Sequence, residues 1–399
     1  MKLTLPTRAS LAPGSRWYEG NGWALTPKQY GVAFAVLYVL VNMLRGLVPG
    51  MSLGGDFVVF QTAAKFVAQG NALGAYTPAS FAEMARSIAP GLGDLHWYYP
   101  PTFLLVVAPL GLLPALPALL VWNGASLAAL YYALRALLGT RRNAGEGLAY
   151  GGVFMGIIFG QSSCLVGACI CWVLAWRERR PYAAGLALAF AACKPQLVVV
   201  LGLILLLEGR WKLLLTAGAA SSVLIALSML CFGTDIWVSW WSHLGYALDV
   251  ISANSILWKW LASLFAAMRG WGAPAALAYG LHFAVLLAAI LALLRLRRHA
   301  SPALCNSAIL TVSCFASPYF YVYDMPMLAA ALMLAHEHIV ARGWKPWEKE
   351  KFTLLWLAPI ALSLLSFVTP IYAQPFLLIG FLWFLVREGA QQKVPPATP

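Results

Sequence analysis

The chain has 399 residues, of which 61% are hydrophobic and only 10% are charged. Soluble domains carry roughly a quarter charged residues, so this composition excludes a water-soluble fold. The formal net charge of +13 would suit a nucleic-acid-binding protein, but Lys and Arg stand in short clusters between apolar runs and form no single basic face. That distribution is typical of a membrane protein whose basic loops stay inside the cell, and no nucleic acid partner is expected.

Apolar runs recur along the whole chain and leave no room for a separate soluble domain. Runs at 30–48, 213–232, 275–294 and 352–368 approach or reach the roughly 20 residues that cross the hydrocarbon core of a bilayer as a helix. The seven cysteines lie mostly within or beside such runs and show no paired spacing, which favours buried thiols over a zinc site or a disulfide framework. The histidines have no metal-ligand spacing, so neither a metal nor another cofactor is expected.

The first part of the chain predicts an anchored entry into the membrane. Basic residues before position 28 indicate a cytoplasmic segment 1–28, after which the run 30–48 exits the membrane and is retained. Residues 49–97 then form the longest extracytoplasmic loop. Within this loop, apolar residues at helical spacing predict two helices lying on the membrane surface, at 57–69 and 78–88, with Asn71, Gly74 and Pro78 between them.

The stretch 99–138 is too long for one span and is interrupted by Pro109, Pro114 and Pro117. Two full passes would place Arg141 and Arg142 outside and would reverse every later basic cluster. We therefore favour one net crossing with a broken or partly re-entrant helix, although two crossings remain an alternative.

From residue 148 onward, short apolar segments alternate with basic clusters at 177–180, 210–212, 295–298 and 342–351, which mark cytoplasmic loops. The expectation is an all-α, polytopic membrane domain over 29–388 with about twelve transmembrane helices and both termini inside. The polar tail 389–399 is expected to be disordered.

Polar and ionisable residues at membrane depth are the first candidates for function, because each is costly unless it is paired or faces a cavity. With the topology above, the following residues fall at or just below the outer surface: Asp56, Lys65, His96, Gln161, Lys194, Gln196, Lys259, Tyr319 and Asp324. One outward-facing polar cavity would collect them.

Several of these residues also have a structural explanation. Asp56 and Asp324 precede helical patterns, and an N-cap is a common role for Asp. Lys194 either binds a lipid phosphate as a point charge or extends to the headgroups. The aromatic residues that follow His96 and those that precede Asp324 either contact sugar rings or form an interfacial belt.

Several short motifs occur in one order along most of the chain: Gly55-Asp56-Phe57, Trp97-Tyr98-Tyr99-Pro100-Pro101, Gly160-Gln161-Ser162, Lys194-Pro195-Gln196, Gly209-Arg210-Trp211, Ser317-Pro318-Tyr319 and Tyr323-Asp324. In this order the chain resembles glycosyltransferase family 87, within the GT-C superfamily of integral membrane sugar transferases. The resemblance implies the GT-C fold and a polyprenyl-phosphate sugar as donor.

The resemblance also implies roles for individual residues. An acidic residue just after the first span is the general base in such enzymes, and Asp56 holds that position. It would deprotonate an acceptor hydroxyl, which attacks the anomeric carbon with inversion. Lys194 and Gln196 are then the candidates for the donor phosphate. The remaining candidates for lining the substrate site are Gln161, Tyr319, Asp324, His96 and Tyr99.

Mannose is the sugar that the resemblance favours, with a lipid or lipid-linked glycan as acceptor and a site facing the periplasm from a bacterial inner membrane. The sequence has no DxD motif and no Gly-rich phosphate loop, which suits a lipid-carried donor. A transporter or flippase of a lipid-linked sugar is the main alternative, since it also needs many spans and a polar cavity. A catalytically silent scaffold of the same fold is the second.

Overall fold

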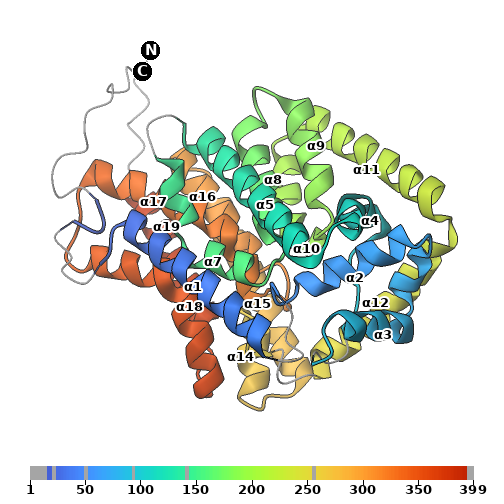
Figure 1. Cartoon of the computed structure of the whole chain (residues 1–399). Helices are drawn as coiled ribbons and strands as arrows, with labels where there is room; N and C mark the ends of the chain where they lie inside the picture. The colour runs from blue at the N-terminus through green and yellow to red at the C-terminus, as the bar shows by residue number, and fades with distance from the viewer. Residues whose placement is uncertain are drawn as a thin grey trace.

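The computed structural model describes residues 16–19, 24–48, 53–91, 95–139, 143–253 and 258–392, with the backbone alone for 246–253. Over these ranges every regular element is helical and no β-strand occurs (Figure 1). Leu261 and Tyr321 form an isolated antiparallel bridge. Most of the expected cytoplasmic segment, Arg141, Arg142 and the last seven residues of the expected tail lie outside the described residues.

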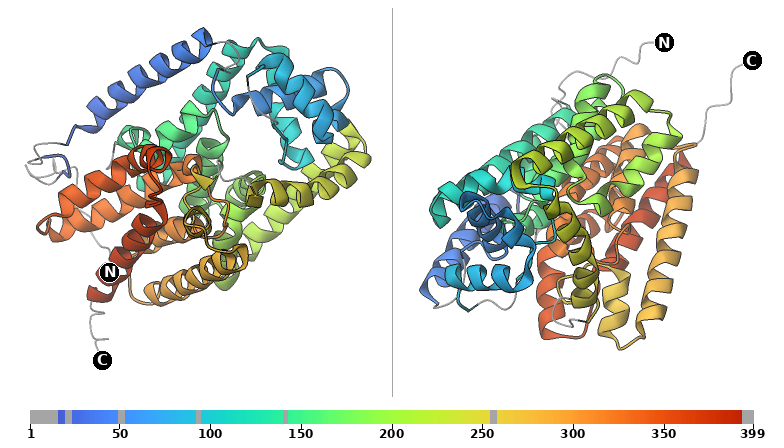
Figure 2. Two further views of the ribbon diagram at one scale, coloured as in Figure 1. Left: turned by 90° about the horizontal axis from the view of Figure 1, so that it is seen from below. Right: turned by 90° about the vertical axis from the view of Figure 1, so that its right-hand side faces the viewer.

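In the described part of the chain, five helices are long and apolar enough to cross a membrane: α1 (Pro27–Leu47), α5 (Ala115–Leu138), α11 (Trp211–Phe232), α15 (Ala275–Leu296) and α18 (Glu348–Val368). At about 1.5 Å per residue, helices of this length match the roughly 30 Å of bilayer hydrocarbon. They support a polytopic membrane protein. Helix α1 lies at the edge of the molecule (Figure 2, left), and only 6% of its apolar window is buried by the rest of the chain.

Most other helices are too short to cross alone. The shorter apolar ones are α2 (Phe57–Ala68), α4 (Pro101–Val107) continued by η2 (Ala108–Leu112), α8 (Ser163–Trp176), α9 (Pro181–Ala191), α10 (Pro195–Leu207) and α16 (Pro302–Ser313). The remaining elements are η1 (Ala72–Tyr76), α3 (Pro78–Ile88), α6 (Ala144–Leu148), α7 (Gly151–Ile158), α12 (Asp235–Ala253), α14 (Leu264–Gly270), η3 (Val322–Met327), α17 (Leu328–Arg342) and α19 (Gln374–Gln391). The number of spans therefore stays a prediction beyond the five long helices.

The two helices expected in the first loop are present as α2 and α3, with η1 between them. Their surroundings differ. Helix α2 is apolar on nearly all sides and most of its residues are buried, which places it inside the protein. It packs so closely on η2 that a Cβ on Gly111 would lie 2.3 Å from the Ala64 carbonyl oxygen. Helix α3 buries one face only, through Phe81, Ala82 and Ala85.

The long apolar stretch after residue 99 is broken where its prolines predict. Helix α4 passes into the 3-10 turn η2, which contains Pro109, and Pro114 is extended immediately before α5 begins. Helix α5 alone has 24 residues. The net number of crossings over this stretch stays a prediction.

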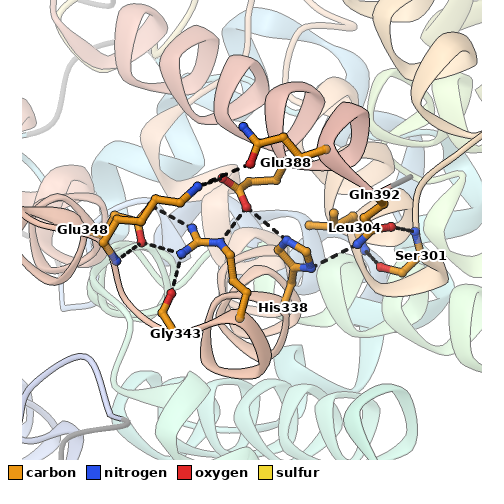
Figure 3. Close-up of polar contacts among 10 residues, drawn as sticks. Ser301, Leu304, His338, Gly343, Glu348, Glu388 and Gln392 are labelled. Carbon is orange, nitrogen blue, oxygen red and sulfur yellow. Dashed lines mark hydrogen bonds and ion pairs between the residues drawn. The ribbon is translucent and has the colours of Figure 1, made fainter. Parts of the chain in front are cut away.

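A charged cluster fastens the C-terminal helix to its neighbours (Figure 3). Buried Glu388 of α19 accepts hydrogen bonds from Arg342 Nε at 2.6 Å, Lys345 Nζ at 3.1 Å and His338 Nε2 at 3.1 Å. Arg342 also donates to both carboxylate oxygens of Glu348, at 2.9 and 2.7 Å. Three helices, α17, α18 and α19, thus meet in one ion-pair network. Helix α19 runs to Gln391, beyond the start of the expected tail.

Candidate functional site

Asp56 lies in a glycine turn between α1 and α2. Gly54 and Gly55 have φ of 70° and 58°, the left-handed region that favours glycine. Asp56 occupies the N-cap position of α2, yet its side chain makes no capping bond. Its Oδ2 instead accepts a hydrogen bond from Gln161 Nε2 at 2.9 Å. Helix capping therefore does not account for this carboxylate.

Gln161 reaches Asp56 because a second glycine turn, between α7 and α8, packs directly against the first. Gly160 has φ of 60°, and a Cβ there would lie 2.6 Å from Phe57 Cβ and 3.1 Å from the Gly54 carbonyl oxygen. Only glycine allows the two turns to approach this closely.

Tyr99 connects this pair to the start of α8. Its hydroxyl lies 3.2 Å from Gln161 Oε1 and 2.8 Å from Ser162 Oγ. Its ring stacks on Phe103, with ring centroids 4.6 Å apart. Neighbouring Trp97 is completely buried, so this aromatic segment packs inside the protein and is not an exposed interfacial belt.

Lys194 and Asp324 form a buried ion pair, with Nζ and Oδ1 2.5 Å apart. Their exposed fractions are 6% and 4%. Ser163 Oγ donates to the same Asp324 oxygen at 2.6 Å and accepts from Lys194 at 3.2 Å. Lys194 therefore does not extend to the headgroups, and Asp324 does not act as a helix cap. The ammonium also lies 5.8 and 5.3 Å from the ring centroids of Tyr99 and Tyr323.

Because Ser162 and Ser163 are consecutive, these contacts form one polar cluster, which we call the Asp56–Lys194 cluster. It contains Asp56, Gln161, Tyr99, Ser162, Ser163, Asp324 and Lys194. Five of the residues singled out in the sequence thus meet. They come from the turn before α2, the segment before α4, the start of α8, the residue before α10, and η3.

Three other candidates lie apart from this cluster in their contacts. The His96 ring lies 5.9 Å from the rings of Tyr98 and His243, which places it beside α12. Tyr319 hydrogen-bonds the hydroxyl of Tyr279 and packs against Phe265, between α14 and α15. Gln196 is half-buried in the first turn of α10, and no hydrogen bond joins it to the cluster among the described residues.

Three residues at the site, Arg45, Ser162 and Ser163, were not among the candidates from the sequence. Arg45, in the last turn of α1, donates from Nη1 to the Ile158 carbonyl oxygen at 2.7 Å. Its Nη2 lies against Gly55, since a Cβ on that glycine would be 3.1 Å away. An arginine within an otherwise apolar span was the available signal. Ser163 had no such signal, because a serine in an apolar helix is inexpensive and common.

The environment of Asp56 favours a carboxyl that binds its proton more readily than usual. Asp56 lies in the turn before α2, outside the five long helices. Enclosure by protein atoms raises the pKa of its carboxyl, while the Gln161 hydrogen bond and the charges of Arg45 and Lys194 act in the opposite direction. Enclosure dominates, so the pKa is raised, as a general base requires.

Among the described residues, no group of three or more His, Cys, Asp or Glu side chains is placed to hold a metal ion. The charged groups of the Asp56–Lys194 cluster are two carboxylates and one ammonium, with Arg45 beside them. This arrangement supplies acid–base and electrostatic chemistry at the ends of several helices of a membrane-type fold.

A family model for glycosyltransferase family 87 matches residues 97–318, more than half of the chain, and the chain belongs to this family. It is thus a membrane glycosyltransferase. The matched range includes Tyr99, Gln161 and Lys194, whereas Asp56, His96, Tyr319 and Asp324 lie outside it. No curated protein and no solved structure matches the chain.

Proposed function

We propose that this glycosyltransferase moves a hexosyl group, with mannose as the first sugar to test, from a polyprenyl-phosphate carrier to a lipid or lipid-linked glycan. The single observation that carries the proposal is the hydrogen bonding of the two carboxylate oxygens of Asp56. Its Oδ2 is held by Gln161, while Oδ1 has no hydrogen-bond partner among the described residues. A carboxylate oriented through one oxygen and open at the other suits a general base.

In the proposed reaction Asp56 takes the proton of an acceptor hydroxyl as its oxygen attacks the anomeric carbon. The bond between that carbon and the phosphate oxygen breaks, and its electron pair leaves with the lipid phosphate. Attack opposite to the leaving group inverts the configuration. The developing charge on the sugar and on the phosphate needs fixed partners, which the cluster supplies.

Lys194 and Gln196 are proposed to bind the departing phosphate. In the structure the ammonium is paired with Asp324, which holds its charge in position. An incoming phosphate would compete with Asp324 for Lys194, and the released carboxylate would orient a sugar hydroxyl. Gln161 and Tyr99 would contact the reacting sugar, and His96 and Tyr319 would line more distant parts of the substrate path.

The proposed orientation places the site on the extracytoplasmic side of a bacterial inner membrane. Helices α8 and α10 both begin at the cluster and both end beside the basic residues of 177–180 and 210–212. Because basic loops favour the cytoplasmic side, the cluster end faces outward. The GT-C arrangement is proposed from membership of glycosyltransferase family 87.

Sugar transfer by purified protein tests this function. The assay uses a radiolabelled polyprenyl-phosphate mannose donor, with parallel glucose and arabinose donors, and a membrane lipid extract. We expect Asp56→Asn to lower the transfer rate by about 10²- to 10⁴-fold, the range typical for loss of a general base. Asp235→Asn, a matched change at the exposed start of α12, should transfer at the wild-type rate.

Transfer by folded Asp56→Asn at the wild-type rate would contradict the assignment of the base. Movement of the donor across a vesicle bilayer by both proteins, with no transfer of any of the three sugars, would instead favour a transporter.

A further inference from the structure

The helix ends opposite the Asp56–Lys194 cluster carry a second charged group, which we call the Glu208 arginine cluster. Glu208 accepts from Arg297 Nη2 at 2.8 Å and from Arg210 Nε at 3.2 Å, and Arg177 Nε lies 3.5 Å away. These residues follow α8, α10 and α15. Since α8 has 14 residues, the two clusters are about 20 Å apart along it.

Acidic side chains of the protein neutralise only a small part of the positive charge at the Glu208 arginine cluster. The three segments 177–180, 208–212 and 295–298 contain eight basic residues and two acidic ones, a net charge of +6. Glu208 forms ion pairs with three guanidinium groups. Glu178, the other acidic residue, pairs with Arg210 at 2.9 Å. An anion from outside the chain would therefore find a strong attractive field.

Arg177 has a buried N–H group for which the described residues provide no hydrogen-bond acceptor. Its side chain is only 11% exposed, and its Nη1 is buried with no hydrogen-bond partner among the described residues. A buried N–H without an acceptor is costly, more so on a charged group. Arg297 and Arg210 lie at the same carboxylate and are 22% and 31% exposed, so a ligand approaching from outside can reach the group.

Exposed apolar side chains border the same helix ends. Trp211 directly follows Arg210 and is 59% exposed, and Leu207 directly precedes Glu208 and is 58% exposed. Tyr182, two residues after Arg180, is 63% exposed. Aromatic and apolar surface beside guanidinium groups at a helix end is the chemistry of a bilayer interface, where phosphate headgroups and acyl chains lie next to each other.

We propose that the Glu208 arginine cluster binds the phosphate of an anionic phospholipid in the leaflet opposite the candidate active site. The phosphate oxygens accept hydrogen bonds from Arg177, Arg210 and Arg297, since guanidinium suits bidentate phosphate contact. The acyl chains then cover the apolar surface at Trp211 and Leu207. This inference does not depend on the proposed sugar, acceptor or base.

Lipid binding by the delipidated, full-length protein in detergent tests the proposal. Dioleoyl phosphatidylglycerol, dioleoyl phosphatidylcholine and inorganic phosphate are added separately, and binding is followed by thermal unfolding and by native mass spectrometry. We expect phosphatidylglycerol to raise the Tm and to form a one-to-one adduct that phosphatidylcholine does not form. Arg297→Gln should weaken phosphatidylglycerol binding about tenfold, as loss of a charge-assisted contact does.

The matched control is Arg298→Gln, which removes the same charge from an exposed neighbour and should change the affinity by less than about threefold. Equal losses in the two variants would overturn a defined site in favour of general surface charge. Equal effects of both lipids would overturn it as well. Stabilisation by inorganic phosphate as strong as that by the lipid would identify a free anion as the ligand. If Arg297→Gln does not fold, Arg210→Gln serves, because Arg210 is the more exposed.

Discussion

The two carboxylates of the Asp56–Lys194 cluster differ in their hydrogen-bond and ion-pair partners. Asp324 accepts from both Lys194 and Ser163 through one oxygen and is 4% exposed. Among the described residues, Asp56 accepts only from the Gln161 amide, and it keeps part of its surface accessible. A neutral amide orients a carboxylate without removing its charge, whereas an ammonium neutralises it. Asp324 is thus part of an ion pair, whereas the contacts of Asp56 agree with its proposed role as the base.

The pH dependence of sugar transfer follows from Asp56. A general base acts in its deprotonated form, and enclosure raises the pKa of Asp56. We therefore expect kcat/KM to fall as the pH drops through a midpoint above about 3.9, the usual value for Asp, with a tenfold loss per pH unit below it. A rate profile from pH 4 to 9 measures this. A rate that stays constant down to pH 4 would argue against the assignment.

Stability measurements on the buried ion pair separate structural from catalytic roles. Lys194→Met or Asp324→Asn leaves one buried charge without its partner, which typically costs about 3–5 kcal/mol. The double variant leaves none, so its Tm in detergent should lie above that of both single variants. Transfer should be impaired in all three. Additive losses of stability would show that the two residues do not act as a pair.

At the level of elements, the turn after α7 is held by donors from two long helices. Arg45 of α1 donates to the Ile158 carbonyl, and Asn123 of α5 donates from Nδ2 to the Ile157 carbonyl at 3.1 Å. Trp122 Nε1 donates to the Gly160 carbonyl at 2.9 Å. The last carbonyls of a helix have no partner within it, so the Arg45 and Asn123 side chains satisfy two of them in α7. They also fix the turn that carries Gln161.

This close packing makes Gly160 a sensitive position. Gly160→Ala places a Cβ 2.6 Å from that of Phe57 and on a left-handed backbone, so the turn and Gln161 must shift. We expect transfer to fall by about 100-fold, as displacements of about 1 Å at a site can produce. Gly124→Ala, in a part of α5 where the added Cβ meets nothing within 4 Å, is the control. Equal transfer by the two variants would contradict this account.

At the scale of the whole molecule, helix length determines how deep the site lies. Helices α8 and α10 have 14 and 13 residues. Each spans about 20 Å, against roughly 30 Å of hydrocarbon. With the Glu208 arginine cluster at one membrane surface, the Asp56–Lys194 cluster lies below the other. A polar cluster at that depth is reached more easily by a lipid-carried sugar than by a soluble one.

The expected orientation can be read from accessible cysteines. In a Cys231→Ser background, which removes the exposed native thiol, Ser87→Cys on α3 and Arg179→Cys after α8 each add one exposed thiol. A membrane-impermeant maleimide should label position 87 but not 179 in intact spheroplasts, and both after lysis. The reverse labelling in intact spheroplasts would place the site on the cytoplasmic side.

The sequence by itself determined the class of protein and the residues that are expensive to bury. The bounds of α2 and α3 agreed with the expected helices to within one residue, because apolar spacing and the turn residues around Asn71 are local signals. The expected twelve spans stay a prediction beyond the five long helices of the described residues. The sequence of an apolar helix is similar whether lipid or protein surrounds the helix. Several of the apolar runs are short helices packed inside the molecule.

Only the tertiary structure decided which polar groups meet. Asp56 and Gln161 are 105 residues apart, and Lys194 and Asp324 are 130 apart. Nothing in either local sequence distinguishes a cap or a lysine reaching the headgroups from a partner in a cluster, because that choice depends on which distant segments pack together. For Asp56 and Gln161 these segments are the two glycine turns. His96 and Tyr319 are as polar as the residues of the cluster, yet they lie beside other helices. Residue chemistry limits the candidates, and packing selects among them.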